Sequence, residues 1–159
     1  MDRESRTLRA TYLTLTGLLS LVNIWSTTRL ALGLVHEGGA EPDAGALLGP
    51  GAAIWLTNII VFGLWYWQFD RGGPAARAHA RKVVPDFQFV QMQNPEPAGR
   101  DWKPEFIDYL YLSYTNATSF SPTDVMPLSR WAKLTMLAQS LISLITMALV
   151  IARAVNILK

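Results

Sequence analysis

The sequence predicts an all-α membrane protein with three transmembrane helices and, between the second and the third, a re-entrant short helix and loop. Half of the 159 residues are hydrophobic and only 16% are charged, whereas about 25% of the residues in soluble domains are charged. Three apolar segments are long enough to cross a bilayer. A fourth, residues 104–118, is apolar but too short to cross, and hydroxyl residues and a proline follow it.

Composition limits the classes of site and partner. The chain has no Cys, which excludes disulfides and thiolate metal sites, and its net charge of +2 is too small to indicate nucleic acid binding. We find no metal-ligand spacing and no Gly-rich phosphate motif, so we expect no metal and no organic cofactor. Six Trp and five Tyr suit a chain that meets two membrane interfaces. The expected location is the cell membrane, with the lipid bilayer as a partner.

The first membrane segment, residues 11–49, follows a basic flank, residues 1–10. A helical core of about 22 residues would extend about 33 Å, enough for the hydrocarbon thickness. Within it, Arg29 is expected to extend its charge to the near interface, or alternatively to face a water-filled cavity, and Asn23 is expected to bond a neighbouring helix. An acidic loop, residues 36–50, contains no Lys or Arg, and this charge bias places it outside the cytoplasm.

The second segment comprises an outer helix at 50–69 and a connecting loop at 70–103. An aromatic belt ends the helix, and Asp70 with Arg71 is interpreted as the exit into water. Asn58 at mid-depth is expected to bridge helices. The loop is rich in Pro, Arg and Lys and is long for a passive connection; residues 75–83 within it could form a short surface helix.

The short helix is expected at 104–118, with Pro104 at its first position and Glu105 and Asp108 at the positive end of its dipole. About 14 residues extend about 21 Å, too little to traverse a bilayer. Its negative C-terminal end favours a cation near the residues that follow. Pro122 ends any helix before it. Asp124 has two possible roles, at a mouth or as a cap of the approach to the next span.

A third transmembrane helix is expected at 131–158. Gln139 and Ser143 lie four residues apart and share one face, which we expect to look toward the axis of a bundle or toward the short helix. They are the candidate residues of an inner-helix cavity.

Residues 113–124, with Pro127 and the last apolar helix, resemble the pore domain of the two-transmembrane potassium channel superfamily, over about residues 50–158. The resemblance implies a homotetramer with a pore helix, an inner helix and a filter-like loop at 118–124. It matches Thr118 and Ser119 with Thr-Thr of the filter and Phe120 with Val. It matches Ser121 and Thr123 with the two Gly, Pro122 with Tyr and Asp124 with Asp. The chain also resembles an uncharacterised, ion-channel-like family of actinobacterial-type membrane proteins, through TrpLeuThrAsn, TrpTyrTrp, AspArgGlyGlyPro, SerPheSerProThrAsp and AlaArgAlaValAsnIleLeu.

The filter-like loop departs from the potassium pattern. Glycine permits the positive φ angles of a carbonyl ladder, and Ser121, Pro122 and Thr123 stand where that freedom is needed. Hydroxyl groups and an acidic ring of Asp124 would then line a wider path for K⁺ or Na⁺, with weak selectivity. The resemblance places the region of residues 71–131 outside the cell, whereas its excess of Arg and Lys places it in the cytoplasm; both orientations stay open.

The main functional hypothesis is therefore a tetrameric cation channel that conducts inorganic ions. The alternative is a non-conducting, channel-derived membrane scaffold or assembly protein, because Phe120 and Pro122 could plug an axis as well as line it. A membrane enzyme is not expected. Its acid, base or ligand candidates, Asp108, Asp124, His36 and His79, show no spacing that demands such chemistry.

Overall fold

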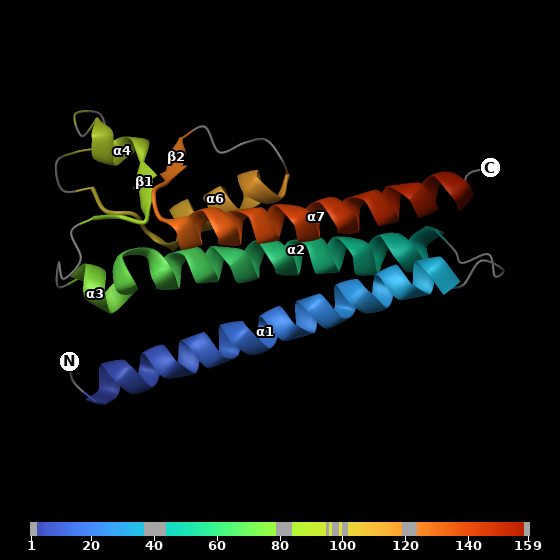
Figure 1. Cartoon of the computed structure of the whole chain (residues 1–159), viewed down its shortest axis with the longest axis horizontal. Coiled ribbons are helices and arrows are strands. Elements are labelled where there is room, and N and C mark those ends of the chain that lie inside the picture. The colour runs from blue at the N-terminus through green and yellow to red at the C-terminus, as the bar shows by residue number, and fades with distance from the viewer. Residues whose placement is uncertain are drawn as a thin grey trace.

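The computed structural model describes residues 3–36, 44–78, 84–94, 96, 99, 102–118 and 124–157, and it is mostly helical (Figure 1). Its elements follow one another in chain order: α1 (Arg3–His36), α2 (Ala44–Phe69), a 3-10 turn η1 (Asp70–Gly72), α3 (Pro74–Ala78), β1 (Phe87–Phe89), α4 (Val90–Gln93), α6 (Phe106–Ala117), β2 (Val125–Pro127) and α7 (Arg130–Ile157).

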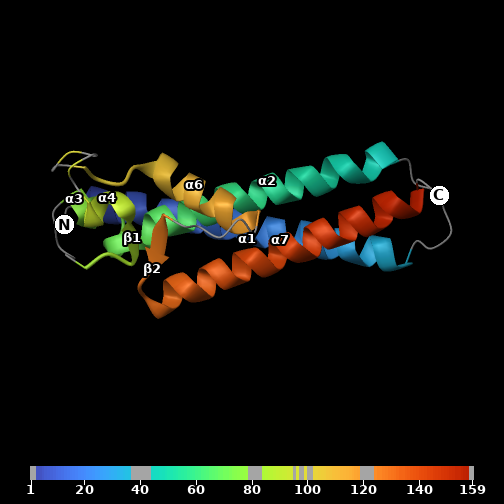
Figure 2. The ribbon, with the colours of Figure 1, turned by 90° about the horizontal axis from the view of Figure 1, so that it is seen from above.

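Three long helices, α1, α2 and α7, lie side by side along the length of the molecule (Figures 1 and 2). α2 runs antiparallel to the other two, so the N-terminal end of α1, the C-terminal end of α2 and the start of α7 meet at one end. We call this the capped end, because α3, β1, α4 and β2 all gather there. The C-terminus lies at the opposite end (Figure 1).

Two of the described segments are long and apolar enough to cross a membrane. They are Gly49–Gly72, with 24 residues, and Arg130–Ala152, with 23 residues, and at about 1.5 Å per residue each exceeds the roughly 30 Å of the hydrocarbon core. α1 is longer, with 34 residues, but is not one of these two segments. Asn23, Arg29 and several Ser and Thr residues reduce its apolar character.

The long helices expose apolar side chains and bury polar ones. The exposed set on α1 and α7 includes Leu15, Leu18, Leu21, Val22, Trp25, Leu134, Leu137, Leu141, Leu144, Ile145 and Ile151. The buried polar set on these helices includes Thr16, Asn23, Asn58, Gln139, Ser143 and Thr146. Soluble monomers rarely expose contiguous apolar surface of this extent, so this distribution suits a surface covered by lipid or by other protein.

The all-α prediction is wrong in one respect, because β1 and β2 form a small antiparallel sheet. Phe87 pairs with Pro127, Gln88 with Met126, and Phe89 with Val125. The two Phe side chains are buried, and the intervening Gln is not. The pair forms because this alternation places two aromatic rings in a core at the capped end. The connecting loop predicted at 70–103 therefore contains η1, α3, β1 and α4.

Most helix boundaries lie close to the predicted ones. α7 begins one residue before the predicted inner helix and α6 two residues after the predicted pore helix. α6 starts late because Glu105 is its N-cap and forms a capping box with Asp108. α2 begins at Ala44, so that Pro50 lies inside it, and the described part of the basic flank belongs to α1. His79 and the end of the predicted surface helix lie outside the described residues.

The hydrophobic core is concentrated at the capped end. It consists of Tyr66, Phe87, Phe89, Tyr109, Leu112, Val125 and Ala132. Ring contacts hold it together: the Phe87 ring centroid lies 5.0 Å from that of Tyr66 and 5.6 Å from that of Trp131. The small sheet is thereby fixed against α2, α6 and α7.

Candidate functional site

α6 lies in the groove between α2 and α7 and packs closely along α2. At its start, the Phe106 ring meets Trp67 edge-to-face with 5.7 Å between centroids. Farther along, a Cβ atom on Gly63 would lie 3.3 Å from the Cα of Leu110, so glycine permits the close approach. Near the end of α6, the Tyr114 ring contacts Trp55 at 6.0 Å. α6 therefore runs from the end of α2 back toward its middle.

The C-terminal end of α6 reaches the middle of both apolar segments. The Ser113 hydroxyl donates to the carbonyl oxygen of Ile59 at 2.6 Å, and the Ser140 hydroxyl donates to Oδ1 of Asn116 at 3.2 Å. Ile59 is the eleventh residue of the 24-residue segment, and Ser140 is the eleventh of the 23-residue segment. α6 thus ends near the midpoint of the length of each segment.

The chain then returns to the capped end. Asp124 accepts a hydrogen bond from the Val90 amide at 3.1 Å through its carbonyl oxygen, and the Leu128 amide donates to the carbonyl oxygen of Asp86 at 2.8 Å. These contacts and the β1–β2 pairing place Asp124 beside the elements that precede α6 (Figure 1). α6 therefore runs from the capped end to the midpoints of α2 and α7, and Asp124 lies at the capped end again.

The predicted filter residues span this return, of which the structure describes the two ends. Thr118 is the C-cap of α6, and its hydroxyl donates to the carbonyl oxygens of Tyr114 at 2.9 Å and Thr115 at 3.1 Å. Asp124, at the capped end, is partly buried. The five remaining candidates lie outside the described residues: Ser119, Phe120, Ser121, Pro122 and Thr123.

Gln139 connects α7 with α2 and α6 through its side-chain amide. Its Oε1 accepts hydrogen bonds from the Tyr66 hydroxyl at 2.6 Å and from Nδ2 of Asn116 at 2.9 Å. Its Nε2 donates to the backbone oxygen of Ser113 at 2.9 Å and to the hydroxyl at 2.7 Å. The side chain is completely buried, so a single residue satisfies polar groups from two other helices.

Asn58 continues this network toward α1. Its Nδ2 donates to the Ser143 hydroxyl at 2.8 Å, and its Oδ1 accepts from Nδ2 of Asn23 at 3.4 Å. Both asparagines bridge helices, as the sequence indicates. Ser143 and Gln139, the predicted cavity residues, are buried and hydrogen-bonded inside the chain. Within one chain they hold helices together.

Asp70 corrects the sequence interpretation of an exit into water, because its side chain is 0% exposed. Oδ1 accepts from the amides of Asp86 at 2.7 Å and Phe87 at 3.2 Å, and Oδ2 accepts from the Tyr109 hydroxyl at 2.7 Å. The Arg71 guanidinium lies 3.9 Å away. One carboxylate therefore joins the end of α2 to the β1 strand and to α6.

A tight reversal after α2 creates this arrangement. Arg71, Gly72 and Gly73 have φ angles of 52°, 79° and 98°, a left-handed conformation that two glycines make accessible. The Arg71 amide donates to Oδ2 of Asp86 at 3.0 Å. The adjacent glycines were the available sequence signal that the chain folds back on Asp70 instead of continuing into solvent.

Cations and aromatic rings surround the buried carboxylate. Nη1 of Arg77 donates to the carbonyl oxygens of Trp67 at 2.7 Å and Asp70 at 2.9 Å, and the guanidinium carbon lies 5.3 Å from the ring centroid of Tyr109. Burial lowers the pKa of Arg77 from its ordinary value, while Tyr109 and Asp70 oppose that change. Asp70 and its partners Asp86, Phe87 and Tyr109 therefore hold the elements of the capped end together, and we call them the Asp70 clamp.

The described side chains of this site form hydrogen bonds and pack against one another. No group of three or more His, Cys, Asp or Glu among them could hold a metal ion. Asp108, an enzyme candidate, is used in the capping box of α6. The candidate site is the C-terminal end of α6, near the midpoints of α2 and α7, together with the hydroxyl-rich sequence that follows it. No protein-family model, curated protein or solved structure matches the chain.

Proposed function

We propose that the chain is a multi-pass protein of the cell membrane in which α1, α2 and α7 cross the bilayer and α6 enters only halfway. Two apolar segments of sufficient length support the crossing by α2 and α7. For α1, the support is its length of 34 residues and the large apolar side chains that it exposes along that length. Buried asparagines join it to α2, as polar residues join helices in lipid.

A half-depth return requires shelter, and this requirement leads to the proposed assembly. Backbone polar groups cannot face lipid without partners, so irregular backbone at membrane depth persists only inside protein or beside water. Residues 118–124 meet that condition when copies of the chain gather around one axis. We propose a homotetramer, in which apolar residues of α7 such as Leu137, Leu141 and Leu144, all exposed in one chain, supply contact surface.

In this assembly the return segments would line a cation pathway. The C-terminal end of α6 directs its partial negative charge to mid-depth, which favours a cation there. Hydroxyls of Thr118, Ser119, Ser121 and Thr123 would supply ligands, with Phe120 and Pro122 as walls, and Asp124 would form an acidic ring at the capped end. The expected selectivity between K⁺ and Na⁺ is weak. Two observations support the proposal: α6 ends beside Ile59 and Ser140, and Asp124 contacts Val90 at the capped end, where α6 begins.

A second candidate is a non-conducting membrane scaffold. The polar face of α6 turns into its own chain, where Ser113 and Asn116 bond to α2 and α7. The polar side chains of Ser113 and Asn116 thus have hydrogen-bond partners without a water-filled pathway beside α6. In this alternative the same fold would serve assembly alone.

Ion flux into liposomes, combined with the mass of the detergent-solubilised protein, tests both candidates. We expect a four-chain mass and flux of both K⁺ and Na⁺. Asp124→Asn should lower that flux about two- to fivefold, because two unit charges about 4 Å apart interact by about 1 kcal/mol even in water. Glu96→Gln, which neutralises an exposed carboxylate of the connecting region, is the matched control and should leave the flux unchanged.

The outcomes separate the candidates. Four chains without flux would favour the scaffold, and a monomer without flux would refute the shared axis. If the protein conducts and Asp124→Asn behaves like the control, Asp124 has no place at the mouth. A reversal potential at the potassium equilibrium value would contradict weak selectivity.

A further inference from the structure

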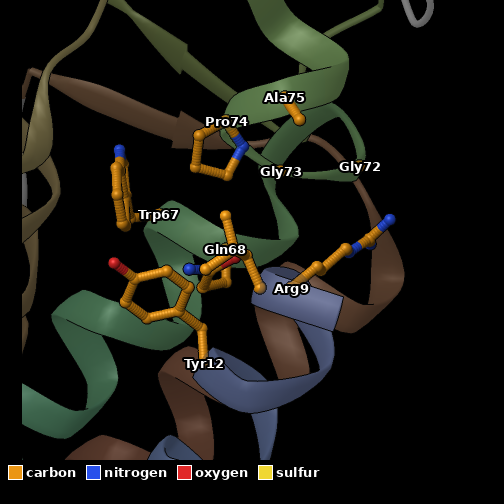
Figure 3. A pocket seen from close by; sticks show the side chains of 9 residues that line it. Arg9, Tyr12, Trp67, Gln68, Gly72, Gly73, Pro74 and Ala75 are labelled. Atoms are coloured by element: carbon orange, nitrogen blue, oxygen red, sulfur yellow. The ribbon is translucent and has the colours of Figure 1, made fainter. Parts of the chain in front are cut away.

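A cavity of about 180 Å³ lies at the capped end, between the N-terminal part of α1 and the reversal that follows α2 (Figure 3). Its lining is largely apolar and aromatic, with two polar side chains that could recognise a ligand. The lining residues are Leu8, Arg9, Tyr12, Trp67, Gln68, Gly72, Gly73, Pro74 and Ala75. The side chains of Asp70, Asp86, Tyr109 and Gln139 are not part of this lining.

Two polar side chains of the lining lie largely inside the molecule. Gln68 is only 3% exposed. Figure 3 shows Gln68 between Tyr12 of α1 and Pro74 of α3. Nε of Arg9 is buried without a hydrogen-bond partner among the described residues. A buried donor without an acceptor is unfavourable, so a ligand with acceptor oxygens would be stabilised here.

The charge at this end favours an anion. Arg9 lies in the lining, and Arg77 places its guanidinium carbon 5.9 Å from the ring centroid of Trp67, which also lines the cavity. The nearby carboxylate of Asp70 is already surrounded by donors. A guanidinium matches phosphate oxygens in geometry as well as charge.

An apolar stripe leads from the cavity along α1. Leu8 and Tyr12, which line the cavity, are followed at helical spacing by Leu15, Leu19 and Val22, and all five are exposed. From Leu8 to Val22 the stripe is about 21 Å long. That length exceeds half of the roughly 30 Å hydrocarbon core, which is the depth of one leaflet. The stripe thus suits the acyl chain of a lipid whose polar headgroup lies in the cavity.

We propose that the cavity binds the phosphate headgroup of an anionic phospholipid, with Arg9 and Gln68 bonded to its oxygens and an acyl chain along the stripe. The proposal rests on the membrane location given above and is independent of ion conduction. Trp67 and Tyr12 at the rim are residues that favour the headgroup level. If the capped end is cytoplasmic, the cavity faces the leaflet that carries anionic lipids.

The test is native mass spectrometry of the delipidated full chain after addition of phosphatidylglycerol or phosphatidylcholine. We expect phosphatidylglycerol to be retained preferentially. Arg9→Gln should reduce its retention about fivefold, the effect of about 1 kcal/mol per basic residue near an anionic lipid. Arg130→Gln is the matched control: Arg130 is exposed at the start of α7, at the same end of the molecule, and its loss should change retention little.

A second variant keeps the test independent of folding. Gln68→Met preserves the size of the side chain and removes an amide that lines the cavity, and the thermal midpoint is measured beside retention to show that the variant is folded. Phosphatidylglycerol retention should fall about two- to tenfold, as expected for one lost hydrogen bond. Retention equal for both lipids, or unchanged in both Arg9→Gln and Gln68→Met, would overturn the proposal.

Inorganic phosphate distinguishes a lipid site from a site for a free anion. Millimolar phosphate should leave phosphatidylglycerol bound, because inorganic phosphate has no acyl chain to lie along α1. Displacement by phosphate would refute the lipid assignment. Ion flux measured on the same preparations is a separate readout, so loss of flux with retained lipid would refute conduction alone.

Discussion

At the scale of single residues, Asp70 shows where local sequence was misleading. It follows an aromatic belt, which predicts a boundary with water. The structure buries it because its partners, the amides of Asp86 and Phe87 and the hydroxyl of Tyr109, come from 16 to 39 positions farther along the chain. Such distant partners cannot be read from the neighbouring residues. The two glycines after it were the accessible clue.

Asp70→Asn should destabilise the protein by about 2–4 kcal/mol. An amide nitrogen would then face donors that now converge on a carboxylate, and buried groups would lose their partners. The change is measured as a fall in the unfolding midpoint by circular dichroism in detergent. Asp124→Asn is the matched control, since Asp124 is only partly buried. Equal midpoints for the two variants would show that the Asp70 clamp does not stabilise the fold.

At the scale of elements, the short helix was predicted well and its surroundings were not. Its length followed from the count of apolar residues before the hydroxyl cluster. The face shared by Gln139 and Ser143 followed from helical spacing. By contrast, Phe87–Phe89 and Val125–Pro127 are too short to stand out as strands, because each is stable only when paired with the other.

Gln139→Leu should separate α6 from α7 more readily, because the Tyr66 hydroxyl and the Asn116 amide would each lose a buried acceptor. We expect a loss of about 2–3 kcal/mol, within the range for unsatisfied buried groups. Limited proteolysis and the unfolding midpoint report it. Gln93→Leu makes the same chemical change at an exposed position of α4. A variant as protease-resistant as this control would argue against a structural network at Gln139.

At the scale of the whole molecule, the order of the long helices followed from hydropathy, but the orientation of the proposed membrane protein did not. The region of residues 71–131, which includes α3, β1, α4 and β2 of the capped end, carries an excess of Arg and Lys. Charge bias assigns this end to the cytoplasm, whereas the potassium-channel resemblance assigns it to the exterior. The two assignments predict opposite accessibility for the same residues.

Single cysteines decide between these orientations, since the chain has none of its own. Ala78→Cys lies at the capped end and Ala152→Cys at the other end of the apolar segment of α7, and both positions are exposed. With the capped end in the cytoplasm, a membrane-impermeant maleimide should label Ala152→Cys in intact cells. It should label Ala78→Cys only after permeabilisation. The reverse pattern would place the capped end outside, and labelling of both in intact cells would contradict a crossing by α7.

The pairing of β1 with β2 also bears on how this architecture could diversify. The two limbs of the excursion are fastened to each other at its base, by the strand pairing and by the hydrogen bond from the Leu128 amide to Asp86. Residues between Thr118 and Asp124 could therefore be exchanged, shortened or lengthened while the register of α7 stayed fixed. The chemistry of this segment could therefore vary between related sequences while the paired strands and the helices kept their arrangement.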